Sequence, residues 1–128
     1  MRIEHIALNI ENVPETVKWY TENLGMEVVR KVNNAEQMTF IGDSGRSTII
    51  ELYCNRKAPI PNYREMDPLV LHIAFTVSDI QAERDRLVEA GATVVEDVYT
   101  SPQKDQLAML RDPWGIAIQL VQRDKPMR

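Results

Sequence analysis

The chain contains an internal repeat, and each copy carries one of its two histidines. Residues 3–10 read IEHIALNI and residues 70–77 read VLHIAFTV, with His-Ile-Ala identical in both. His5 and His72 therefore occupy equivalent positions. A repeat of this length predicts two similar modules that pack together rather than one irregular fold. Matched histidines further predict two half-sites around a shared ligand, for which a metal ion is the candidate.

Both copies have the same predicted order of elements, a strand followed by a helix and three further strands, which makes each module a βαβββ unit of an α+β fold. β-branched and apolar residues predict the first strands over 3–10 and 70–77. The residues expected to start or end the helices are Asn12, Gly25, Ser78 or Asp79, and Gly91. The remaining strands are expected over 26–32, 38–41, 47–55, 92–98, 107–111 and 116–122.

The domain organisation follows from the length of 128 residues and from the repeat. This length suits a single domain that buries its own core. Module one is expected over 1–55 and module two over 69–123. The connector 56–68 contains three prolines and is long enough to act as a lid or an arm.

Alternation along the strands places both histidines away from the large aliphatic residues. In the last strand of each module, Glu51 and Gln119 also point away from their apolar neighbours. One such residue alone is ordinarily a satisfied polar group on a half-exposed sheet. The matched set of His5, Glu51, His72 and Gln119 instead predicts one divalent metal ion per site, namely Zn, Ni, Fe, Mn or Co.

Composition excludes several classes of partner. The net charge is −4, and the 15 Lys and Arg residues are scattered, which disfavours nucleic acid. No apolar run approaches the roughly 20 residues that cross a bilayer, and the first residues predict a strand rather than a signal peptide. The single cysteine, Cys54, excludes an internal disulfide and suits the cytoplasm, with packing as its expected role.

Four segments resemble the vicinal oxygen chelate superfamily. They are the early histidine in Ile3–Ala7, the run from Trp19 to Met26, the central histidine in Leu71–Phe75, and the turn Asp112–Gly115. The superfamily includes glyoxalase I (lactoylglutathione lyase), methylmalonyl-CoA epimerase, fosfomycin-resistance thiol transferases, extradiol dioxygenases and bleomycin-resistance proteins. The resemblance covers residues 3 to about 123, and it implies curved, barrel-like mixed sheets with the helices outside.

The resemblance implies metal-ligand roles for His5, Glu51 and His72. Members of the glyoxalase I kind carry a glutamate on the last strand as fourth ligand and base, where this chain has Gln119. An amide does not accept a proton at neutral pH, so Glu51 is left as the expected catalytic group. The same difference disfavours the dioxygenase and fosfomycin chemistries, because both use the last-strand carboxylate.

The resemblance also suggests substrate-binding residues and an assembly. Asn55 matches a glutathione-contacting asparagine of bacterial glyoxalase I, and Asn9 stands where that family has a glutathione-binding arginine. Lys104 is a candidate to bind an anionic group of a small-molecule substrate. Many members form homodimers with sites at the interface, whereas others assemble the site within one chain, and the sequence leaves both arrangements open.

The first functional hypothesis is a metal-dependent lyase or isomerase similar to glyoxalase I, which moves a proton next to a metal-chelated carbonyl. An epimerase is disfavoured, because it normally needs a base on each face of the substrate. The alternative is a metal-free small-molecule-binding or resistance protein of the bleomycin-resistance type. A third possibility is that the site is vestigial and the protein serves as a subunit or a regulator.

Overall fold

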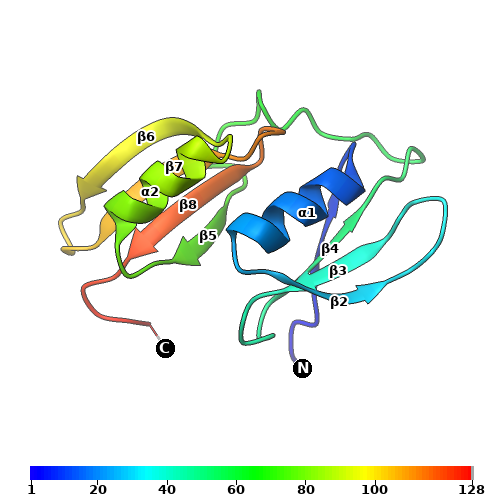
Figure 1. Ribbon diagram of the computed structural model, residues 1–128, viewed down its shortest axis with the longest axis horizontal. Helices are drawn as coiled ribbons and strands as arrows, with labels where there is room; N and C mark the ends of the chain where they lie inside the picture. Colours follow the sequence, from blue (N-terminus) through cyan, green and yellow to red (C-terminus); the bar gives the residue numbers. More distant parts are fainter. Residues whose placement is uncertain (128) are drawn as a thin grey trace. The chain divides into compact units, whose positions relative to one another are not determined.

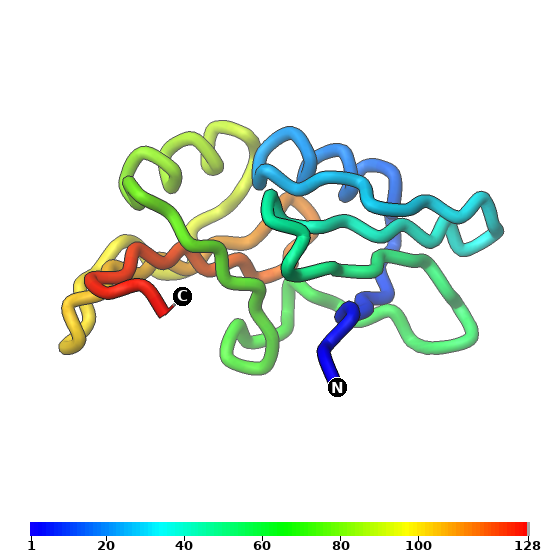
Figure 2. The backbone as a smooth tube through the Cα atoms, turned by 90° about the horizontal axis from the view of Figure 1, so that it is seen from below, coloured from blue at the N-terminus to red at the C-terminus, as the bar shows by residue number. Residues whose placement is uncertain are grey.

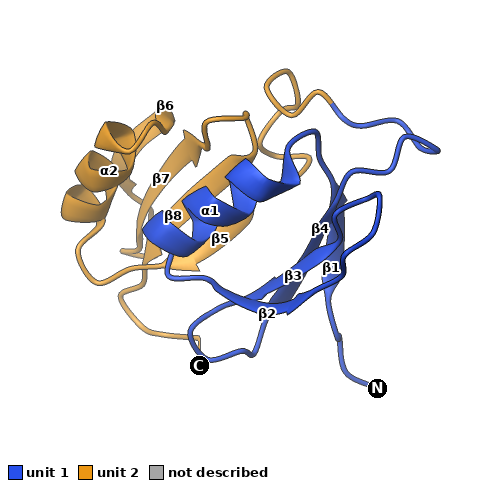
Figure 3. Cartoon of the chain, turned by 45° about the vertical axis from the view of Figure 1, so that its right-hand side comes forward, with its two compact units in different colours: residues 1–61 blue, residues 62–128 orange. Residues whose placement is uncertain are grey.

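Each copy of the repeat lies in its own structural unit. The computed structural model describes residues 1–127, and the units are Met1–Pro61 and the residues from Asn62 onward (Figure 3). The boundary falls inside the predicted connector 56–68, so the two ends of the connector belong to different units. The assignment of the whole chain to one domain stays a prediction.

The two units have the same element order and the same strand order (Figure 1). The first contains β1 (Ile6–Asn9), α1 (Val13–Asn23), β2 (Glu27–Lys31), β3 (Thr39–Gly42) and β4 (Ile49–Tyr53). The second contains β5 (Ile73–Thr76), α2 (Ile80–Glu89), β6 (Thr93–Thr100), β7 (Gln106–Arg111) and β8 (Ala117–Gln122). The sheet orders are β1-β4-β3-β2 and β5-β8-β7-β6.

Each sheet is mixed. The pairs β1/β4 and β5/β8 are parallel, and the other pairs are antiparallel. In each unit the helix packs across one face of its own sheet (Figure 2), with α1 against β2, β3 and β4, and α2 against β6, β7 and β8. The predicted α+β fold of two βαβββ modules is confirmed, with curved sheets that remain open. Neither helix of the described residues is long and apolar enough to cross a membrane.

The two strands that follow the histidines are shorter than predicted. The sequence predicts strands over 3–10 and 70–77, whereas β1 begins at Ile6 and β5 at Ile73. In the second copy, the N–H of Val70 donates to the carbonyl of Asp67 over 2.9 Å and closes a turn. Because residues 67–70 form this turn, the strand cannot begin at residue 70. Both histidines therefore lie immediately before a strand, at its entrance.

The helix ends follow the sequence signals. The Asn12 side chain accepts a hydrogen bond from the N–H of Glu15 and caps α1. In the second helix Asp79 is the cap, through the N–H of Ala82, which decides between the two residues that the sequence offered. Gly25 has a φ of +64° just after α1, a conformation that glycine adopts at low cost.

One face of each sheet is apolar and buried, as the alternation predicts. On β4, Ile50 and Leu52 are 5% and 0% exposed, whereas Glu51 between them is half-buried. On β8, Gln119 is half-buried between the buried Ile118 and Leu120, and its neighbours on the same face, Ala117 and Val121, are buried as well. Cys54 continues the apolar face of β4 and is half-buried, in agreement with a packing role. The candidate ligands thus lie on the sheet faces opposite the apolar core.

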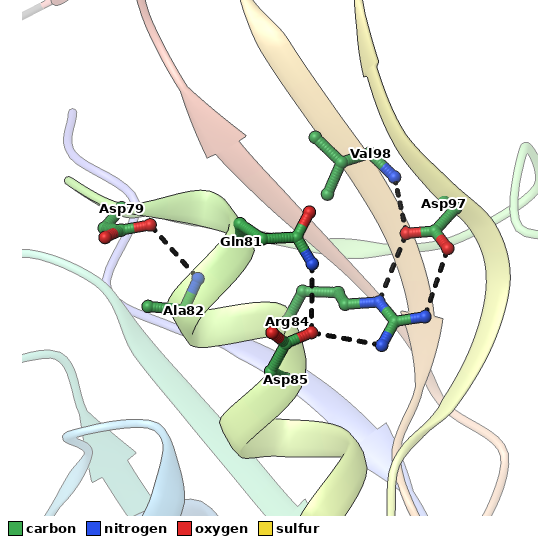
Figure 4. Close-up of polar contacts among 7 residues, drawn as sticks. All are labelled: Asp79, Gln81, Ala82, Arg84, Asp85, Asp97 and Val98. Atoms are coloured by element: carbon green, nitrogen blue, oxygen red, sulfur yellow. Dashed lines mark hydrogen bonds and ion pairs between the residues drawn. The ribbon is translucent and has the colours of Figure 1, made fainter.

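The edge strand β6 is held against α2 by one arginine (Figure 4). Arg84 donates from Nε and Nη2 to the two carboxylate oxygens of Asp97, each over 3.1 Å. Asp97 lies between Glu96 and Tyr99, where the register with β7 shifts. The hydrogen bonds from Arg84 and from the N–H of Val98 lower the pKa of Asp97. The pair therefore stabilises the folded state above the usual aspartate range, and this contribution is lost as pH falls through the lowered pKa.

We expect Asp97→Asn to lower the melting temperature at pH 7 and to have a smaller effect at a second, acidic pH below the lowered pKa of Asp97, where the aspartate of the parent protein is itself protonated. Thermal unfolding followed by circular dichroism at both pH values measures this difference. Glu96→Gln is the matched control, because it removes a charge from the same strand without touching Arg84. An Asp97→Asn effect that is equal at both pH values would contradict the assignment.

Candidate metal centre

The strand register brings each histidine to the same sheet face as a polar residue of the last strand. In the first unit Ala7 pairs with Glu51, and His5 lies two residues before Ala7. In the second unit Ala74 pairs with Gln119, two residues after His72. Side chains two residues apart along extended backbone point to the same side. Each unit therefore presents one pair, His with Glu or His with Gln.

The first pair is in direct contact. His5 Nε2 lies 3.2 Å from Glu51 Oε2, and His5 Nδ1 lies 3.2 Å from Glu4 Oε1. A neutral imidazole carries one proton, so one ring nitrogen must present a lone pair to a carboxylate oxygen. Either a proton on Nε2 or a cation between Nε2 and Glu51 satisfies the contact with Glu51. The Glu51 side chain is 12% exposed, which strengthens its interaction with either one.

Phe40 completes the surroundings of His5. The two rings lie edge to face, with centroids 5.3 Å apart and planes at 85°. Phe40 of β3 is also the register partner of Glu51, so it lies beside both members of the pair. No motif in the sequence marks Phe40 as part of the site, although its pairing opposite Glu51 follows from the β3–β4 hairpin. Phe40 shields one side of the pair from water and restrains the imidazole.

The second histidine is oriented by a backbone carbonyl. His72 Nδ1 lies 2.8 Å from the carbonyl oxygen of Pro68. A carbonyl only accepts hydrogen bonds, so Nδ1 donates and carries the proton. In the neutral ring this leaves the lone pair on Nε2, the arrangement commonly found when histidine binds a metal. Gln119 is half-buried, and its register partner on β7 is Met109.

The donor atoms fit a divalent metal ion. Two ligand atoms about 2.1 Å from one ion, at angles between about 90° and 110°, lie about 3.0–3.4 Å apart, and the 3.2 Å between His5 Nε2 and Glu51 Oε2 falls in this range. Imidazole nitrogen and carboxylate oxygen suit Zn²⁺, Ni²⁺, Fe²⁺, Mn²⁺ and Co²⁺. Within either unit, no group of three or more His, Cys, Asp or Glu side chains of the described residues forms a metal-binding cluster. Each unit taken alone offers only two of the four predicted ligands.

The predicted substrate residues Asn9 and Asn55 bind each other. Asn9 Nδ2 donates to the carbonyl of Asn55 and the N–H of Asn55 donates to Asn9 Oδ1, both over 2.8 Å. The Asn9 amide thereby fixes the start of the connector to the end of β1. The side chain of Asn55 accepts from the N–H of Lys57 over 3.0 Å, which leaves its amide nitrogen without a hydrogen-bond partner in the part of the chain described. Of the two, Asn55 has the side chain more available to a ligand.

The predicted substrate residue Lys104 lies in the loop between β6 and β7. It has a φ of +69° and lines a pocket of about 400 Å³ with Gln103, Asp105 and Lys125, among others. Arg123 lies 2.7 Å from Asp105 and, together with the N–H of Asp124, lowers the pKa of Asp105. Asp105 is thus already paired with Arg123. This loop lies near the end of β8, at least three residues from Gln119, a strand distance of about 10 Å.

Comparison with known proteins identifies the family. The sequence profile of the Glyoxalase/Bleomycin resistance protein/Dioxygenase superfamily matches residues 2–120. The chain belongs to this superfamily, as its resemblance to the vicinal oxygen chelate proteins predicts.

Named relatives match between about three quarters and nearly all of the chain. A probable lactoylglutathione lyase of Vibrio parahaemolyticus is 31% identical over 129 residues, covering 94% of this chain and 90% of the relative. An ethylmalonyl-CoA/methylmalonyl-CoA epimerase of Cereibacter sphaeroides is 33% identical over 99 residues, covering 73% and 74%. The crystal structure of a glyoxalase family protein from Bacillus cereus has a TM-score of 0.81 at 21% identity, covering 95% and 93%, and supports the fold.

We expect Asn9→Ala to destabilise the connector, because it removes both hydrogen bonds to the backbone of Asn55. A net loss of about 1–3 kcal/mol in unfolding free energy is expected, with faster amide exchange at Asn55. Chemical denaturation and hydrogen exchange measure these effects. Asn55→Ala is the matched control, because its backbone still bonds to Asn9. Equal destabilisation by the two variants would contradict the structural role of Asn9.

Proposed function

We propose that this protein is a metal-dependent lyase or isomerase of the glyoxalase I kind, which moves a proton next to the carbonyl of a small molecule chelated by the metal. The observation that carries the proposal is the approach of His5 Nε2 to Glu51 Oε2, at a separation that suits two ligands of one metal ion. The second histidine supports it, since the proton on His72 Nδ1 leaves Nε2 available as a ligand.

The proposed ligands of one divalent metal ion are His5, Glu51, His72 and Gln119. Because each unit supplies two of them, the centre needs both kinds of unit, from one chain or from the two chains of a homodimer. When bound, the metal would stabilise the negative charge that develops on a substrate oxygen as the neighbouring C–H proton leaves. Gln119 would contribute its amide oxygen and no charge.

Glu51 is the proposed proton carrier. It is the only carboxylate among the four ligands, and an amide cannot take this role at neutral pH. Its side chain is 12% exposed and lies beside Phe40 and His5, so it is shielded from water and held in place. A proton moved between adjacent carbons on one face of the substrate needs a single base. An epimerase needs a base on each face, and Gln119 offers none on the other side.

One relative supports the proposal by its name, a probable lactoylglutathione lyase. Another is named an ethylmalonyl-CoA/methylmalonyl-CoA epimerase, the reaction that Gln119 disfavours here. We assign substrate binding to Asn55 and Lys104, whose side chains have polar groups available. Asn9 holds Asn55 in place, because its side chain forms hydrogen bonds with the Asn55 backbone. The proposed location is the cytoplasm, in keeping with the single cysteine. In the alternative, a metal-free binding protein, a ring proton rather than a metal ion would hold the His5–Glu51 pair together.

We expect protein purified without chelators to contain close to one equivalent of transition metal per site, and His72→Ala to lose it. Elemental analysis by mass spectrometry, before and after dialysis against Ni²⁺ or Zn²⁺, measures the stoichiometry. The matched control is Asn33→Ala, an exposed polar residue outside both pairs. Less than about a tenth of an equivalent after dialysis would defeat the metal centre and favour the metal-free alternative.

Glu51→Gln is expected to reduce turnover by about 10²–10⁴-fold, which is the usual contribution of a positioned acid or base. The assay follows hemithioacetals formed from a 2-oxoaldehyde with glutathione and with other small thiols. Gln119→Glu adds an anionic ligand and is expected to tighten metal binding. Should Gln119→Glu also create an activity that the parent protein lacks on every substrate tested, the native reaction would be a different one.

A further inference from the structure

Arg111, the last residue of β7, binds backbone carbonyls of the connector. Its Nη1 donates to the carbonyls of Tyr63 over 2.8 Å and Gly115 over 3.0 Å, and its Nη2 donates to the carbonyl of Met66 over 2.9 Å. The side chain is half-buried, and no Asp or Glu of the described residues forms an ion pair with it. Desolvating a guanidinium that has no carboxylate partner is costly. The hydrogen bonds to these three carbonyls offset that cost.

The same stretch of connector is held from a second side. Arg64 packs against Gly115, and its Nη2 donates to the carbonyl of Pro113. Gly115 has a φ of +102°, and a Cβ there would lie 2.7 Å from the nitrogen and 2.8 Å from the Cα of Arg64. The glycine is therefore required for this close approach. Tyr63, at the start of the stretch, is 9% exposed. Residues 63–66 are thus docked on the turn between β7 and β8.

The docked stretch leads directly to the carbonyl that orients His72. The N–H of Leu69 donates to Asp67 Oδ1 over 2.8 Å, and the N–H of Val70 donates to the carbonyl of Asp67 over 2.9 Å. Pro68, inside this turn, has a fixed φ. Its carbonyl accepts from His72 Nδ1 at 2.8 Å. The position of this acceptor therefore depends on where residues 63–66 are held.

In the first unit, the histidine is oriented by a side chain rather than by a backbone carbonyl. His5 Nδ1 lies 3.2 Å from Oε1 of Glu4, whose side chain is 82% exposed. An exposed flexible carboxylate restrains a ring less than a backbone carbonyl in a turn does. The orientation of the two equivalent histidines is thus achieved by different means.

We propose that Arg111 is a positioning residue for His72: through residues 63–68 it holds the Pro68 carbonyl that fixes the imidazole with its proton on Nδ1. The role of Nε2 as a metal ligand rests on the proposed function. The orientation of the ring does not, because it follows from the contacts in the second unit alone.

The test is the tautomer of His72 in the metal-free protein. With only two histidines, ¹⁵N-labelled imidazole groups can be resolved by NMR and assigned with His5→Gln. The measurement is made at about pH 8.5, above the usual range of histidine titration. We expect the proton of His72 on Nδ1 in the parent protein and a mixture of tautomers in Arg111→Met. Arg111→Lys, which keeps a donor, should restore part of the Nδ1 form.

Two further variants keep the test decisive. Gly115→Ala displaces Arg64 and should also mix the tautomers, which provides a second route should Arg111→Met fail to fold. Arg56→Met removes an exposed connector arginine that pairs with Glu11, and it should leave the tautomer unchanged. A folded Arg111→Met and a folded Gly115→Ala that both retain the Nδ1 form, or a parent protein with its proton on Nε2, would overturn the inference.

Metal affinity separates this inference from the proposed function. If both hold, Arg111→Met should weaken Zn²⁺ or Co²⁺ binding by about 10–100-fold, the usual effect of losing support behind a ligand, whereas Arg56→Met should not. A parent protein that binds neither metal but shows the tautomer change would retain the role of Arg111 and refute the metal centre. Tight metal binding by the parent protein, with no tautomer change in the variants, would support the metal centre and refute the role of Arg111.

Discussion

The parallel pairing of the first and last strands within each unit determines where the candidate ligands lie. In the first unit it sets Ala7 opposite Glu51, which brings His5 to the same face. The second unit repeats the pairing with Ala74 and Gln119. A shift of one residue in either register would turn the polar side chain into the apolar core. The alternation that buries the core therefore also fixes the two ligand pairs.

The sequence predicted the features that have a local periodic signal. The repeat gave the order of elements, and alternation placed Glu51 between the buried Ile50 and Leu52. Caps such as Asn12 follow from short-range chemistry and were also predicted correctly. The fold and the faces of its strands could thus be derived before any coordinates, because each depends on residues only a few positions apart.

The features that the sequence did not predict depend on hydrogen bonds between side chains and distant backbone. Asn9 bonds to the backbone of Asn55, 46 residues away, and Arg111 to the carbonyl of Tyr63, 48 residues away. No periodic pattern marks a carbonyl as a partner, since every residue has one. The late start of the strand predicted over 70–77 has a different origin, a local turn in which the N–H of Val70 donates to the carbonyl of Asp67.

The two halves of the proposed centre differ in charge. In the first half His5 is flanked by the carboxylates of Glu51 and Glu4, whereas in the second half His72 and Gln119 bring no negative charge. A divalent ion held by two neutral imidazoles, one carboxylate and one amide retains a net charge of about +1, where two carboxylates would leave none. Compared with a centre that has two carboxylates, the proposed centre would therefore attract the negative charge that develops on a substrate oxygen more strongly. It would offer only one base. Such a balance favours a proton transfer confined to one face of the substrate, next to Glu51.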